Sequence, residues 1–167
     1  RVQADGLLRW RASRLKVADG LQLWIEHLLW SAMGGRGESR MYGRENTEWR
    51  FSEMLEDQAR YYLTELVAGY RRGMMEPLML LSQSGGAWLA ACYDAPSDAV
   101  LWDEATQKKA KSQFISAWEG RVMVEGEQAD IWLQRLFRTL DEAHYQRIIH
   151  EACQYLLPLF RFNQPRQ

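Results

Sequence analysis

The sequence has no long apolar stretch, few cysteines and almost no net charge. No run of residues is long and apolar enough to cross a bilayer and no signal peptide is visible, so we expect no membrane partner. Cys92 and Cys153 lie far apart and predict reduced thiols in a cytoplasmic protein. A formal net charge of −1 excludes a chain-wide basic field that would recruit nucleic acid.

Recognisable catalytic motifs are missing as well. A metal-dependent nuclease of the restriction-enzyme kind usually carries Asp or Glu, any residue and then Lys, whose charge polarises the scissile phosphate or water. The sequence has no such triplet; the nearest ones end in arginine, at 38–40, 48–50 and 119–121, and we interpret them as chance patterns on a charged surface. His144 and His150 are six residues apart, which does not suit a helical metal pair. We therefore predict no catalytic residue and no metal ligand.

What the sequence does have is a local basic cluster, which includes Arg9, Arg11 and Arg14. These three arginines are candidates for DNA contact, and the alternative is an ordinary solvated surface. Phosphate contacts would make the affinity fall steeply with salt. We expect weak DNA binding at most from this chain alone.

The chain is also apolar at its end, where soluble proteins usually fray. The apolar residues there are Leu156, Leu157, Leu159, Phe160 and Phe162. One interpretation is that they complete the core after Pro158 interrupts the last helix. The other is that Phe160 and Phe162 also dock onto a partner subunit.

The residue pattern predicts a helix-rich α+β fold in a single domain, 1–167, with a sheet-containing part over about 1–95 and a helical part over about 99–162. Strands are expected over 6–13, 39–43, 47–51, 76–82 and 85–93. Helices are expected from 17 to the Gly34–Gly35 stop, from a Ser52 cap to Gly73, from an Asp103 cap to about 119, over 126–139, and from an Asp141 cap to about 156. In the second helix, we expect a buried stripe of Leu55, Ala59, Leu63, Leu66 and Tyr70. Because the chain starts at Arg1, we expect a fragment of a larger subunit.

Three long stretches carry a family resemblance. They are "GLLRWRASRLKVADGLQLWIEHLLWSAMGG" (6–35), "LVAGYRRGMMEPLMLLSQSGGAWLAACYDA" (66–95) and "YLLPLFRFNQ" (155–164). In these stretches the chain resembles the C-terminal region of the RecC family, the gamma subunits of bacterial exodeoxyribonuclease V (the RecBCD helicase–nuclease). The resemblance runs over essentially the whole chain in one register.

The resemblance implies a partial, catalytically inactive PD-(D/E)xK (restriction-endonuclease-like) fold with a small sheet and additional C-terminal helices. The strand in the place of the acid and lysine is 8–11, whose neutral and cationic side chains cannot hold Mg²⁺. The implied role is a non-enzymatic interaction domain that joins RecB and RecD on double-strand DNA ends, for repair and recombination. ATP and Mg²⁺ would act in other subunits, with no cofactor here. The alternative is a nuclease that still cleaves, through acids such as Glu38, Glu48 and Asp103.

Overall fold

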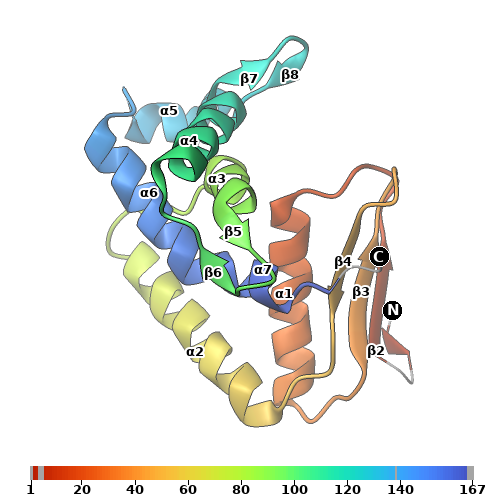
Figure 1. Ribbon diagram of the computed structural model, residues 1–167. Coiled ribbons are helices and arrows are strands. Elements are labelled where there is room, and N and C mark those ends of the chain that lie inside the picture. Colours follow the sequence, from red (N-terminus) through yellow and green to blue (C-terminus); the bar gives the residue numbers. More distant parts are fainter. Residues whose placement is uncertain (1, 4–5, 138, 165–167) are drawn as a thin grey trace. The chain divides into compact units, whose positions relative to one another are not determined.

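The structure is a computed structural model that describes residues 2–3, 6–137 and 139–164. These residues form a helix-rich α+β protein, as predicted (Figure 1). They group into two compact units: a first unit, residues 1–76 and 162–167, and a second unit, residues 77–161. The single-domain assignment over 1–167 stays a prediction.

The first unit is built on a sheet with the strand order β1-β2-β3-β4. Its strands are β1 (Val2–Gln3), β2 (Gly6–Trp10), β3 (Glu38–Tyr42) and β4 (Glu48–Phe51). β2 and β3 are parallel, so the chain must cross over between them, and it does so through α1 (Val17–Ala32). β3 and β4 form the predicted antiparallel hairpin, whose turn holds Glu45 and Asn46 at positive φ.

One face of this sheet packs on α1 (Figure 1). Side chains alternate along a strand, so Met41 of β3 and Phe51 of β4 are buried on that face. From α1, Leu23, Trp24 and Leu28 fill the same core. His27 of α1 is also fully buried there, and its Nδ1 lies 2.8 Å from Ser39 Oγ of β3.

The second helix of this unit, α2 (Glu56–Gly73), starts later than predicted and buries a different stripe. Ser52 is not its cap, because the Ser52 hydroxyl donates to Gln164 instead. Leu55 and Tyr70 are 78% and 68% exposed, so the predicted stripe was wrong at both ends. The buried and half-buried positions follow Ala59, Tyr62, Leu66 and Gly69, three or four residues apart. The buried face of α2 therefore differs from the predicted one, because it includes Gly69, which has no side chain and gives no hydrophobic signal in the sequence.

The second unit is mainly helical. Its elements are α3 (Ser84–Cys92), β5 (Tyr93–Asp94), β6 (Ala99–Val100), α4 (Glu104–Glu119), β7 (Gly120–Arg121), β8 (Val124–Glu125), the 3₁₀ helix η1 (Glu127–Ala129), α5 (Ile131–Leu136) and α6 (Glu142–Tyr155). A last helix, α7 (Leu157–Phe162), follows α6. The predicted caps Asp103 and Asp141 are confirmed, since their carboxylates accept from Thr106 N and His144 N. α6 ends before Pro158, as expected from the missing N–H of proline.

Two predicted strands in this region were wrong. Residues 77–81 form neither strand nor helix, and the run over 85–93 is largely α3. A short, fully apolar run fits a buried helix as well as a buried strand, so its periodicity does not separate them. What settles the helix is distant in sequence: the buried Glu127 carboxylate accepts from Gln83 N at 3.1 Å and Ser84 N at 2.7 Å, at the start of α3.

The predicted helix over 126–139 is shorter and divided. Asp130 has an extended backbone (ψ 122°), which separates η1 from α5. Its carboxylate accepts from Trp132 N at 2.8 Å and starts a new helix there. Position 138, near the predicted end, lies outside the described residues.

Candidate functional site

The face of the sheet opposite α1 gathers charged and aromatic side chains. We call it the outer face. The register places Leu8, Arg40 and Arg50 in one row across β2, β3 and β4. Trp10, Tyr42 and Glu48 form the next row. Trp10 is 68% exposed and Tyr42 38%, so this face presents aromatic rings beside charges.

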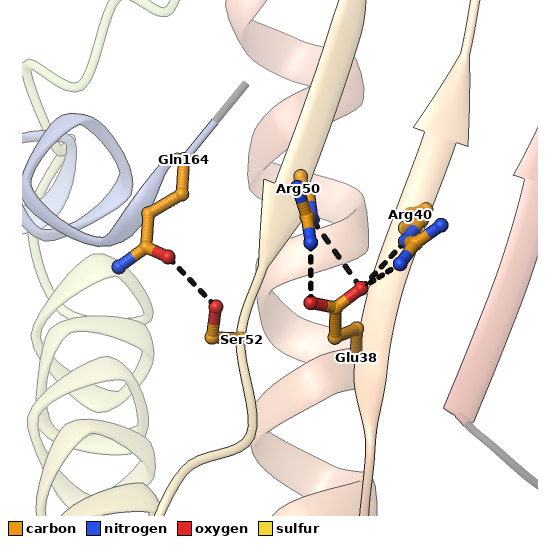
Figure 2. A network of polar contacts seen from close by, with 5 residues as sticks. All are labelled: Glu38, Arg40, Arg50, Ser52 and Gln164. Atoms are coloured by element: carbon orange, nitrogen blue, oxygen red, sulfur yellow. Dashed lines mark hydrogen bonds and ion pairs between the residues drawn. The ribbon is translucent and has the colours of Figure 1, made fainter. Parts of the chain in front are cut away.

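On this face, at the start of β3, one carboxylate is shared by two arginines (Figure 2). Glu38 accepts from Arg40 Nε at 2.7 Å and, on its other oxygen, from Arg50 Nη2 at 2.6 Å. Arg40 Nη2 and Arg50 Nε also donate to Glu38. The hydrogen bonds from Arg50, and next those from Arg40, hold the pKa of Glu38 below its ordinary value. The carboxylate is therefore ionised and its oxygens are occupied.

This cluster joins two triplets that the sequence interpretation set aside as chance. Residues 38–40 lie on β3 and residues 48–50 on β4. In the register of this hairpin, Arg40 lies directly opposite Arg50. Their distances in sequence gave no reason to combine them. The signal that was available is the predicted hairpin itself, because both triplets lie in strands of the same pair.

The outer face does not fit a divalent metal. Mg²⁺ prefers carboxylate oxygens, and those of Glu38 are taken by guanidinium groups. Asp103 belongs to the second unit, where it caps α4. Among the residues that the structure describes, no group of three or more His, Cys, Asp or Glu is placed to hold a metal ion.

Residues 162–164 are part of the first unit, and Asn163 and Gln164 extend its sheet. Phe51 and Asn163 form an antiparallel bridge, and Gln164 N donates to Arg50 O at 2.9 Å. The side chain of Gln164 accepts from the Ser52 hydroxyl at 2.8 Å (Figure 2). Asn163 and Gln164 are thus fixed beside Arg50, one of the two arginines that bind Glu38.

The two phenylalanines proposed from the sequence as partner contacts lie in different units. The Phe162 ring stacks on Trp24, with centroids 5.3 Å apart, and meets Tyr62 edge-on at 5.5 Å. The Phe160 ring meets Tyr93 at 6.2 Å in the second unit. Both are half-buried, so each has packing within its own unit and some exposed surface. A role of Phe160 and Phe162 in partner binding stays a prediction.

Each of the three candidate DNA-binding arginines lies near a carboxylate. Arg9 pairs with Glu26 at 2.6 Å, Arg11 pairs with Asp19, and Arg14 lies 3.9 Å from Glu45. Arg9 and Arg11, with Trp10, line an open hollow at one edge of the sheet. These pairs reduce the positive field that a phosphate would meet. DNA contact by the three arginines stays a prediction.

The comparisons with known proteins agree on one family. The model of the RecC C-terminal domain matches residues 1–93. The "RecBCD enzyme subunit RecC" of Escherichia coli (strain K12) is 54% identical over 163 residues, which is 98% of this chain and 14% of that protein. The protein of the same name from Buchnera aphidicola subsp. Acyrthosiphon pisum is 35% identical over 160 residues, 96% of this chain and 15% of that protein. The chain thus spans about 14–15% of the length of these relatives.

Among the described residues, no helix is both long and apolar enough to span a membrane.

Proposed function

This chain belongs to the RecC C-terminal domain family, and on that premise we propose that it is a non-catalytic interaction domain of an exodeoxyribonuclease V complex. In this proposal it helps to hold RecB and RecD subunits together on double-strand DNA ends, for repair and recombination in the cytoplasm. ATP and Mg²⁺ are used by the other subunits. A partial PD-(D/E)xK fold without its catalytic groups is part of the same proposal.

The observation that supports the non-catalytic role is that the Glu38 carboxylate is bonded to two arginines. A nuclease of this kind needs a carboxylate free to bind the metal and a cation beside it that faces the phosphate. Here two arginines donate to the one carboxylate, so its negative charge is fully compensated and both of its oxygens are occupied. Arginine-to-carboxylate pairs of this kind are strong and directional, and they act as structure rather than as a metal site.

We expect no divalent-metal binding by the 167-residue chain. Calorimetric titration with Mg²⁺ or Mn²⁺ should show no saturable heat, and incubation with linear DNA should release no fragments. The reason is that a metal ion would have to displace two guanidinium groups from Glu38. Saturable binding with cleavage that disappears in both Glu38→Gln and Glu48→Ala variants would instead establish the nuclease alternative.

The assembly role has its own expected result. Consider a full-length subunit from which the 167 residues of this chain are deleted. The yield of RecB and RecD that co-purify with it should fall at least tenfold, because the deletion removes the exposed apolar side chains of both units. The control is the intact subunit with Lys109→Ala, which alters one exposed charged side chain and should leave assembly intact. If the shortened subunit assembled as well as the intact one, the proposed function would be wrong.

A further inference from the structure

The β7–β8 hairpin of the second unit ends in three apolar side chains that its own unit leaves uncovered. We call Val122, Met123 and Val124 the apolar tip. They are 93%, 99% and 63% exposed. Within the second unit, the hairpin extends beyond the end of α4 (Figure 1). Single exposed apolar residues are common, but three adjacent ones at the end of a projecting hairpin are not.

The base of this hairpin is closely built. A side chain on Gly126 would place its Cβ 2.1 Å from Trp118 O, and one on Gly120 would place its Cβ 2.4 Å from Gly126 N. The two backbones therefore touch where only glycine fits. Arg121 Nε also donates to Ser116 Oγ of α4 at 2.8 Å. The tip is thus held on a fixed stem, in contrast to a loose loop.

The tip also goes against local conformational preference. Met123 has φ 66°, in the left-handed region that glycine and asparagine adopt readily and methionine does not. A turn chosen only for the stability of the free chain would carry Asn or Gly at this position. Two unfavourable features, an exposed apolar side chain and a left-handed backbone, coincide at one residue. Such a coincidence calls for a contact outside the unit that compensates for it.

We propose that the apolar tip inserts into an apolar pocket of a partner protein subunit, with Met123 at its centre. This inference rests on the proposed function, in which the chain works inside a multi-subunit complex. Three side chains are too few for the roughly 800 Å² per partner of a standard interface. The tip therefore acts as an anchor within a larger contact, filling one pocket there.

The charges beside the tip favour a protein over DNA, a lipid surface or a second copy. Glu119 and Glu125 are exposed on either side of the stem, and Arg121 is the cation between them. The carboxylates would repel DNA phosphates and anionic lipid headgroups. In a tip-to-tip dimer they would also face each other. They suit a pocket whose rim carries Lys or Arg.

The first test separates binding from folding in the full-length subunit. Met123→Asn should weaken the affinity for the RecB and RecD subunits at least tenfold, measured by titration of the purified proteins. Hydrogen exchange over residues 116–128 should be unchanged or slower in the variant, since Asn suits a positive φ. The matched control is Met75→Asn, which alters a methionine that is 89% exposed in the first unit and should change the affinity less than twofold. Unchanged affinity in Met123→Asn, or an equal loss in both variants, would overturn the inference.

The second test identifies the occupant of the pocket. A photoreactive side chain at position 123 of the full-length subunit, in the complex assembled on DNA, should cross-link to RecB or RecD. A cross-link to DNA, to another part of the same subunit or to a second copy would refute a partner pocket. If the subunit lacking 1–167 still assembled, the proposed function would fail. If that deletion abolished assembly while Met123→Asn did not, only the role of the tip would be wrong.

Discussion

Replacement of Trp24 by alanine is expected to lower the free energy of unfolding by about 3–5 kcal/mol. Trp24 is 1% exposed. The centroid of its ring lies 5.0 Å from that of Phe51, 5.6 Å from that of Tyr62 and 5.3 Å from that of Phe162. These three rings belong to β4, α2 and the last residue of α7. The substitution therefore leaves a cavity at the point where they all contact α1. Urea unfolding of the 167-residue chain, followed by circular dichroism at neutral pH, measures the loss.

Trp10→Ala is the matched control for this prediction. It removes the same side chain from the same unit, but Trp10 is 68% exposed on the outer face. Its effect should stay within about 0.5 kcal/mol, as is usual for exposed positions. Equal losses in the two variants would show that the aromatic cluster around Trp24 does not hold the first unit together.

Acidification from pH 7.5 to pH 5 should destabilise the chain by about 2 kcal/mol through His27. Burial lowers the pKa of His27 from 6.5 to about 4, despite a smaller opposing effect of the Ser52 backbone. The folded state therefore favours the neutral ring, and the unfolded state binds the proton more readily. This contribution to stability is fully present above pH 6.5, falls as the pH drops toward 4, and is lost below that value. Urea unfolding at a series of pH values measures it.

Variants of two histidines separate this effect from general acid sensitivity. His27→Gln should lower stability at pH 7.5 but abolish most of the change between pH 7.5 and pH 5. His150→Gln alters an exposed histidine and should keep the full change. Glu38, whose pKa is lowered by its arginines, keeps its stabilising contribution down to pH 5 and loses it only at more acidic pH. An NMR titration that gave His27 a pKa near 6.5 would contradict the prediction.

Local sequence patterns were enough to predict the elements whose own residues show strand alternation or a helix cap. The hairpin of β3 and β4 alternates clearly, and α4 and α6 each begin at an aspartate cap. Where the stabilising partner is distant in sequence, prediction failed. α3 takes its N-terminal partner from Glu127, 43 residues beyond Ser84, and Ser52 bonds to Gln164 instead of capping α2. No window along the chain contains both members of such a pair.

The candidate site shows the same limit. The absence of an acid-x-lysine triplet, the apolar chain end and the family resemblance were all available from the sequence by itself. The tertiary structure alone decided that Glu38 meets Arg40 and Arg50 together and that Phe162 stacks on Trp24. Composition and periodicity specify which side chains an element offers. Which of them meet depends on strand register and on the pairing of residues 163–164 with β4, and those are set by contacts between segments far apart in sequence.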